Sequence, residues 1–201
     1  MVLAAIDGAG RLLVKSWFFL PEAALQKGGQ AERETINLYR QWKDGRWLWT
    51  TPGDFVDHNR VERLIRRLHR SVGAKRITFD QFAAAQAMAS RLNEDLGDGG
   101  EPLAAILHKN AANVTDPAKD LEARVKAQAE LLRHDDNPVM TWMIGNAVVT
   151  RGVNGSILPK KATPMSPNKI DGVDALVNAM APMQLPAPDD GVDDWLTSLA
   201  A

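Results

Sequence analysis

Short apolar runs alternate with amphipathic helical segments along this chain, and this alternation limits the folds open to it. Residues 2–6 and 11–20 flank Asp7-Gly8-Ala9-Gly10, a pattern that predicts a hairpin. From Asn59 onward the apolar spacing becomes helical, and Ile77–Asp80 then forms a short strand pattern that a further helix follows. Strands and helices mix without a strict βαβ repeat. The sequence therefore predicts an α/β domain with a mixed sheet and helices on both faces.

Several local signals predict where the helices begin and end. Asn59 and Glu62 have the spacing of a capping box, and Gly73 is expected to end the helix that they begin. Pro117 suits the first turn of a later helix, because a proline lacks the N–H that the first turn leaves unpaired. Residues 170–183 have the composition of a last helix.

Composition excludes several classes of function. The chain has 201 residues and no cysteine, which rules out disulfide scaffolds, thiolate zinc sites and cysteine nucleophiles. The sequence contains no phosphate-binding loop, no G-x-G-x-x-G fingerprint and no G-x-S-x-G elbow, so an ATPase, a dinucleotide-dependent redox enzyme and an α/β-hydrolase are not expected. It has no apolar run of membrane-spanning length and no secretory signal, and we expect a cytoplasmic protein.

The formal net charge of −1 hides an uneven distribution of charge. Residues 1–80 carry 14 Lys and Arg against 9 Asp and Glu, whereas residues 185–201 carry four Asp and no cation. The basic stretch at residues 60–76 is most simply the solvated face of an amphipathic helix, but phosphate contact is the natural functional use of such a face. The candidate nucleic-acid contacts are Arg60, Arg63, Arg67 and Arg70, with Lys160 and Lys161 as a separate pair.

Acidic residues occur at two places where catalytic carboxylates are often found. Asp80 ends a predicted strand, although an Asp there is also favoured as a helix N-cap. Asp171 and Asp174 open the last predicted helix on one face, where acids also complement the helix dipole. Carboxylates of this kind hold Mg²⁺, so Asp80, Asp171 and Asp174 are the candidate metal ligands.

A series of short motifs follows in order from residue 10 to residue 181, and each is weak alone. They are Phe18-Phe19-Leu20-Pro21, Trp42, Gly45, Thr51-Pro52-Gly53, Val56-Asp57, Ile77-Thr78-Phe79-Asp80, His134, Asn137-Pro138-Val139, Trp142, Asn146, Pro159-Lys160 and Lys169-Ile170-Asp171-Gly172. Taken together, these motifs resemble the nuclease domain of tailed-phage terminase large subunits.

The resemblance implies a ribonuclease H-like fold and a two-metal endonuclease that cuts concatemeric DNA during genome packaging. Three acids hold two Mg²⁺ or Mn²⁺ ions in that family; Asp80 matches the second acid and Asp171 the third. Asp174 stands where a small or apolar residue is expected. The implied partners are double-stranded DNA, the terminase small subunit and the portal, with no membrane. The host cytoplasm is the implied location.

The chain also departs from the family pattern. The first acid normally lies on a strand before the opening hairpin, whereas Asp7 falls in the hairpin turn; we expect both that strand and its acid to be absent here. In the family an ATPase motor precedes the nuclease domain, and we expect none here, since the sequence contains no phosphate-binding loop. We expect a nuclease domain over residues 1–184 and an acidic tail over 185–201. The alternatives are a DNA-binding or packaging-complex module that has lost cleavage, and a generic α/β domain whose acids are only caps.

Overall fold

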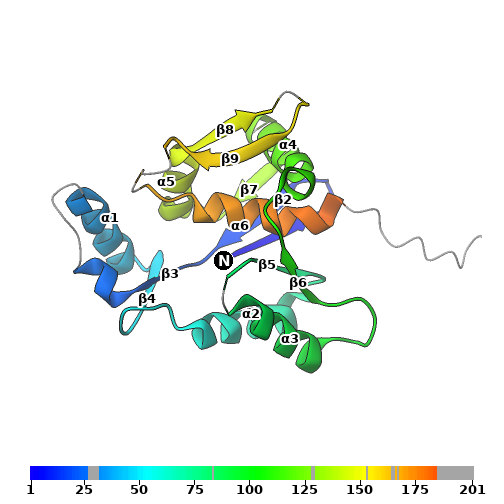
Figure 1. Ribbon diagram of the computed structural model, residues 1–201, viewed down its shortest axis with the longest axis horizontal. Helices are drawn as coiled ribbons and strands as arrows, with labels where there is room; N and C mark the ends of the chain where they lie inside the picture. The colour runs from blue at the N-terminus through cyan, green and yellow to red at the C-terminus, as the bar shows by residue number, and fades with distance from the viewer. Residues whose placement is uncertain are drawn as a thin grey trace, which may run out of the picture.

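The computed structural model describes residues 1–26, 32–82, 84–127, 130–152, 154–163, 166 and 168–184, and the predicted acidic tail lies outside them. Within the described residues the chain forms a mixed α/β fold of short strands and six α-helices (Figure 1). The strands are β1 Val2–Ile6, β2 Leu12–Ser16, β3 Phe18–Pro21, β4 Leu48–Thr51, β5 Ile77–Asp80, β6 Ala104–Leu107, β7 Leu132–His134, β8 Ala147–Arg151 and β9 Ile157–Lys161. The helices are α1 Arg33–Asp44, α2 His58–Val72, α3 Ala85–Leu96, α4 Ala111–Ala127, α5 Pro138–Asn146 and α6 Asp171–Met180, with short 3₁₀ turns η1 Glu22–Leu25 and η4 Ala181–Gln184.

The strands pair in four small sheets rather than in the one mixed sheet that the sequence predicts. β1 pairs with β2 in antiparallel fashion and β2 with β7 in parallel, so this three-stranded sheet is mixed. β3 pairs with β4, and β5 with β6, both in parallel, while β8 and β9 form an antiparallel hairpin. The mixed strand directions are as expected, but the sheet is divided.

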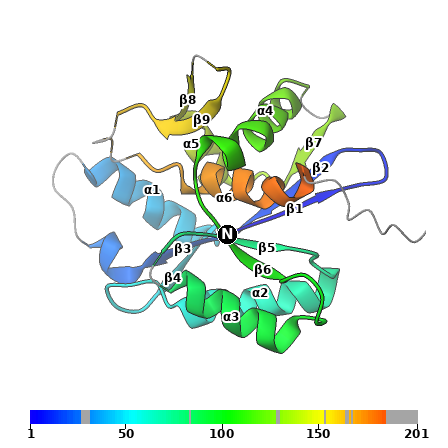
Figure 2. The ribbon, with the colours of Figure 1, turned by 45° about the vertical axis from the view of Figure 1, so that its right-hand side comes forward.

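Among the described residues, three clusters of buried apolar side chains form the hydrophobic core. The largest joins the β1–β2–β7 sheet to α5 and α6 and contains Leu12, Trp42 and Met180. The second packs α2 and α3 against β5 and β6, around Phe79 and Leu92. The smallest joins α4 and β9 to α6. The β5–β6 group lies on one side of α6, and α4, α5, β8 and β9 lie on the other (Figures 1 and 2).

The opening hairpin forms as the sequence predicts, and Asp7 is part of its turn. The Asp7 carboxylate accepts hydrogen bonds from the backbone N–H groups of Ala9 and Arg11, both at 2.9 Å, and pairs with the Arg11 guanidinium. Gly10 takes a φ of 77°, a conformation that glycine adopts at little cost. The second apolar run divides at Trp17, because β3 leaves the first sheet to pair with β4.

The predicted capping box at the start of α2 is wrong. Asp57 is the N-cap, and its carboxylate accepts from the Asn59 N–H at 2.9 Å. Glu62 is only 7% exposed and instead binds the Arg66 and Arg91 guanidinium groups, so its side chain does not reach back to the helix end. At the other end, Gly73 takes the left-handed conformation that was expected of a helix stop.

Helix α4 begins earlier than the sequence predicts. Pro117 lies inside the helix rather than in its first turn. The earlier start has a local cause: the Asn110 side chain accepts from the Asn113 N–H at 3.0 Å and so satisfies a donor of the first turn. The last predicted helix is confirmed as α6 followed by η4.

Candidate active site

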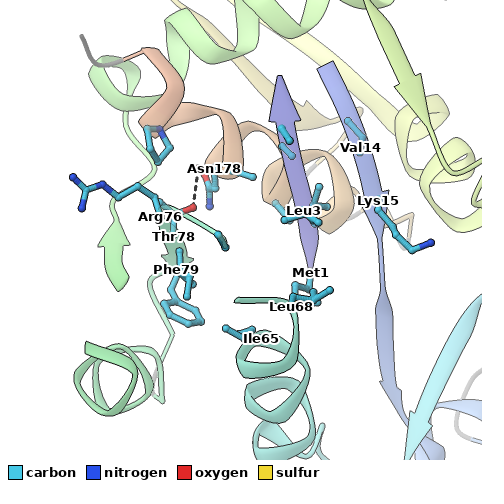
Figure 3. Close-up of a pocket in the computed structure, with 18 of the residues that line it drawn as sticks. Met1, Leu3, Val14, Lys15, Ile65, Leu68, Arg76, Thr78, Phe79 and Asn178 are labelled. Carbon is cyan, nitrogen blue, oxygen red and sulfur yellow. Dashed lines mark hydrogen bonds between the residues drawn. The ribbon is translucent and has the colours of Figure 1, made fainter. Parts of the chain in front are cut away.

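The structure brings three of the predicted acids to one cavity. Asp80 is the last residue of β5, Asp171 is the first residue of α6, and Asp174 follows one turn later. All three line a cavity of about 1260 Å³ that also reaches β1, α2 and η4, at Pro182 and Met183. Figure 3 shows the wall of this cavity, with Thr78 and Phe79 of β5 on one side and Leu3 of β1 on the other.

Asp80 does not cap the helix that follows it. Its carboxylate accepts a hydrogen bond from the Gln81 N–H at 2.8 Å, whereas α3 begins at Ala85 with Ala84 as its N-cap. The interpretation of Asp80 as a helix N-cap is therefore wrong. Its side chain is exposed and forms no ion pair with a described residue, which leaves its carboxylate oxygens available to a ligand.

Asp174 is held by a lysine that sequence reasoning did not single out. The Lys109 ammonium lies 2.5 Å from the Asp174 carboxylate. Burial nevertheless raises the pKa of Asp174 above its ordinary value, and the nearby charges of Asp171 and Asp80 raise it further, against the lowering effect of Lys109. The three carboxylates are thus close enough to interact electrostatically.

Lys109 reaches this site because β5 and β6 run parallel. Their carboxyl ends meet at one edge, with Asp80 opposite Leu107, so the loop after β6 passes beside the acids. A single lysine in a loop carries no sequence signal of its own. No strand is predicted before Lys109, so its position beside the acids could not be inferred from the sequence.

The amino group of Met1 also lies at this site. It is buried and donates to the Trp17 carbonyl at 2.8 Å. Burial lowers the pKa of this amino group to about 6, although the charge of Asp171 acts in the opposite direction. The start of β1 therefore lies near the start of α6, in a region shielded from water.

Comparison with protein-family models decides the family. Residues 2–185 match the model of the terminase large subunit endonuclease domain. The chain belongs to that family. Nucleases of this family typically depend on metal ions.

Two individual proteins resemble this terminase nuclease domain. Protein YmfN of Escherichia coli (strain K12) is 29% identical over 167 residues, which cover 83% of this chain and 35% of YmfN. The crystal structure of the HK97 bacteriophage large terminase superposes with a TM-score of 0.72 at 21% identity, over 90% of this chain and 36% of that one. The chain thus spans about a third of the length of either protein, and the second match supports the fold.

The candidate site has oxygen ligands of the right kind for a divalent cation, but few of them. Among the described residues, no group of three or more His, Cys, Asp or Glu side chains is arranged to hold a metal ion. Asp80 and Asp171 offer hard carboxylate oxygens, whereas Asp174 is engaged with Lys109. The donor set fits Mg²⁺ or Mn²⁺ in chemistry.

The predicted DNA-contacting arginines lie away from this cavity. Helix α2 turns an apolar stripe toward it, made up of Val61, Ile65, Leu68 and Val72. Helical geometry places Arg63, Arg67 and Arg70 on the opposite face of α2, where all three are exposed.

The remaining basic candidates are partly engaged elsewhere. Arg60 donates to the Thr50 carbonyl at 2.9 Å and lies 5.7 Å from the centre of the Trp49 ring. Lys160 is exposed on β9, and the Lys161 ammonium donates to the Ser166 carbonyl at 3.3 Å. Neither lysine lines the cavity of the acids. No described helix is long and apolar enough to cross a bilayer.

Proposed function

We propose that this terminase nuclease domain hydrolyses phosphodiester bonds of double-stranded DNA with the help of divalent ions held by Asp80 and Asp171. The observation that carries the proposal is that the end of β5 and the start of α6 face the same cavity. The substrate that the family implies is concatemeric phage DNA, with the terminase small subunit and the portal as partners.

Each residue of the site has a distinct part in this proposal. Asp80 and Asp171 would hold Mg²⁺ or Mn²⁺, which supply Lewis-acid stabilisation of the phosphate and activation of water. Asp174 is a candidate third ligand that must first exchange Lys109 for the ion. Lys109 neutralises part of the charge of the acids and is placed to contact a phosphate that approaches them.

We expect the chain alone to cut DNA slowly. Two divalent ions bring four positive charges, and two free carboxylates are too few to order both. The acid expected on a preceding strand is not supplied by Asp7, which lies in the hairpin turn and outside the cavity.

Metal binding and plasmid nicking test the proposal together. Titration of Mn²⁺ followed by electron paramagnetic resonance should show binding that both Asp80→Asn and Asp171→Asn weaken at least about tenfold, because each removes a charged ligand. The same variants should abolish any slow Mn²⁺-dependent nicking of supercoiled plasmid. Asp44→Asn, a matched change at an exposed acid outside the cavity, should leave both measurements unchanged.

Two results would refute this assignment. Mn²⁺ binding that neither variant at Asp80 or Asp171 alters would place the metal elsewhere. Rapid cleavage by the chain alone that Asp7→Asn abolishes would make Asp7 the first catalytic acid.

A second candidate function is a DNA-binding or packaging-complex module without cleavage. The absence of a three-ligand metal group among the described residues favours it. It predicts salt-dependent duplex binding with no nicking at any Mn²⁺ concentration, and no effect of the variants at Asp80 and Asp171 on that binding.

A further inference from the structure

Side chains alternate between two sides along the segment that joins β2 to β3. On one side Ser16 and Phe18 are buried, whereas on the other side Lys15 is exposed and Trp17 and Phe19 are half-buried. The second side of this segment therefore carries aromatic rings that the core does not fully cover.

Strand β4 extends the second side with two tryptophans. Leu48 is buried in the largest apolar cluster, whereas Trp49 is half-buried and Trp47, just before the strand, is 41% exposed. β3 and β4 pair in parallel with Phe19 opposite Trp49, and the two rings meet edge to face with their centroids 5.5 Å apart. We call Trp17, Phe19, Trp47 and Trp49 the aromatic face.

Two cations lie over rings of the aromatic face. The Lys15 ammonium is 5.8 Å from the centre of the Trp17 ring, and the Arg60 guanidinium is 5.7 Å from that of the Trp49 ring. Arg60 is fixed in this position, because it also donates to the Thr50 carbonyl at 2.9 Å. That bond uses one of several N–H donors of the guanidinium, so others are left for a phosphate.

The aromatic face borders the cavity of the acids. Lys15 and His58 line that cavity together with Asp80, and His58 and Arg60 both belong to the first turn of α2. A DNA strand bound at Asp80 can therefore continue across the first turn of α2 to the ring of Trp49.

We propose that the aromatic face binds an unpaired stretch of DNA, with bases stacked on Trp47 and Trp49 and a phosphate held by Arg60. Rings at a protein surface stack on the faces of nucleobases, and a strand exposes those faces only where it is unpaired. The choice of DNA as the ligand rests on the proposed function, whereas the arrangement of rings and cations does not.

Charge favours a nucleic acid over a protein as the occupant. The two charged groups that lie over the rings are both cations, which a phosphate chain requires. Two acids on the adjoining segments are engaged with the protein: Glu22 accepts from the Thr50 hydroxyl at 3.4 Å, and Asp57 caps α2.

Binding of oligothymidine in the absence of metal tests the proposal. A strand of about twelve nucleotides lies within the length that such surfaces cover. With EDTA present, fluorescence polarisation of the labelled strand should show saturable binding to the full chain. The unlabelled strand should quench tryptophan fluorescence, because its bases stack on the rings.

A strand of abasic sites tests stacking with the unaltered protein. It keeps the phosphates of the oligothymidine and lacks the bases, so it should bind at least about tenfold more weakly and quench less.

Substitutions separate stacking from charge. The double change Trp47→Leu and Trp49→Leu should weaken oligothymidine binding at least about tenfold and remove most of the quenching. Arg60→Gln should keep the quenching and lower the log–log salt slope by about 0.7, the value for one phosphate contact on a single strand. Trp142→Leu is the matched control, because it removes a half-buried tryptophan of α5 outside the aromatic face; it should bind and quench like the wild type.

Equal binding of the oligothymidine and the abasic strand would overturn the proposal. So would binding of neither strand, which would favour a protein as the occupant of the aromatic face. Wild-type binding by the double variant would overturn it as well, provided that the variant shows the far-ultraviolet circular dichroism of the wild type.

The absence of metal from this assay separates the inference from the nuclease proposal. Oligothymidine binding that depends on Trp47 and Trp49, in a chain whose Mn²⁺ binding does not depend on Asp80 or Asp171, would uphold the aromatic face and overturn the nuclease proposal. No oligothymidine binding, with Mn²⁺-dependent nicking that Asp80→Asn abolishes, would overturn the aromatic face and uphold the nuclease proposal.

Discussion

The two sides of the cavity are built differently. On the side of β1, β2 and β7, large side chains such as Leu12, Trp42 and Met180 are buried against α5 and α6. On the side of β5 and β6, much of the core is small, with Ala85 and Ala89 of α3 packed beside Leu92. Stabilisation by burial scales with apolar area, so burial stabilises the β5–β6 side less than the side of β1, β2 and β7. The edge that presents Asp80 thus belongs to the less stabilised side.

Few polar contacts tie the two sides together. The Thr78 hydroxyl of β5 donates to the Asn178 carbonyl of α6 at 2.8 Å, across a sequence separation of 100 residues. The Lys109–Asp174 ion pair, between the loop after β6 and α6, is a second polar contact, and apolar contact along α6 adds to both. We therefore expect the β5–β6 side to open locally before the whole domain unfolds.

Truncation of the two most buried leucines should cause the largest loss of stability. It should also show whether the two sides of the cavity unfold independently. Leu12 and Leu92 are both 0% exposed, and each change to Ala should lower the free energy of unfolding by about 2–5 kcal/mol. Hydrogen exchange should show Leu92→Ala losing protection mainly in β5, β6 and α3. Leu12→Ala should lose protection throughout the domain, because its core is the larger one.

Equal loss of protection in β2 and β5 for Leu92→Ala would show that the two cores unfold as one unit. Leu13→Ala is a suitable control, because the Leu13 side chain is 38% exposed on the same strand as Leu12. Leu13→Ala should lower the free energy of unfolding much less than Leu12→Ala.

Glu62→Gln should cause the next largest loss of stability, and this loss should affect the β5–β6 side first. The buried Glu62 carboxylate lies 2.7 Å from the Arg66 guanidinium and 2.6 Å from that of Arg91, which ties α2 to α3. Loss of its charge should cost about 1–3 kcal/mol at pH 7. Chemical denaturation of the two proteins at several pH values measures the difference.

The pH dependence has a definite sign. The hydrogen bond from Arg91, followed by that from Arg66, lowers the pKa of Glu62 below its ordinary value of 4.5, so the ionised form stabilises the folded chain. The difference between wild type and Glu62→Gln should be full at neutral pH and should shrink as the pH falls below 4.5. A difference that stays constant down to pH 3 would contradict this ion pair.

Local signals sufficed for the sequence to predict the opening hairpin, β5 and α6, including the acids at the ends of β5 and α6. Prediction failed where distant residues decide the outcome. The capping box failed because Glu62 binds Arg91, 29 positions away. Lys109 was missed because only the parallel pairing of β5 and β6 brings it to Asp174. The division into four sheets likewise depends on long-range pairing that periodicity does not specify.

Thr78→Val should cause a smaller loss of stability, because it removes a single hydrogen bond between the two sides of the cavity. The substitution keeps the shape of the side chain and removes the hydroxyl that binds the Asn178 carbonyl, at a cost of about 1 kcal/mol. Hydrogen exchange at β5 should rise, whereas exchange at β2 should not. Thr141→Val, which removes a longer hydroxyl bond of 3.4 Å within the start of α5, is the matched control. It should leave exchange at β5 unchanged.

Replacement of the exposed arginines of α2 should hardly change stability and should act on DNA binding alone. Arg63, Arg67 and Arg70 lie opposite the apolar stripe of α2, and surface changes of this kind are within about 0.5 kcal/mol. If these side chains contact phosphates, the log–log salt dependence of duplex binding should lose about 0.9 in slope per arginine changed to Gln. The same substitution at Arg33 and Arg46, two exposed arginines outside α2, should leave the slope unchanged. An unaltered slope in the α2 variant would identify this face as a solvated surface, and would leave Lys109 and the other cations near the acids as the DNA contacts.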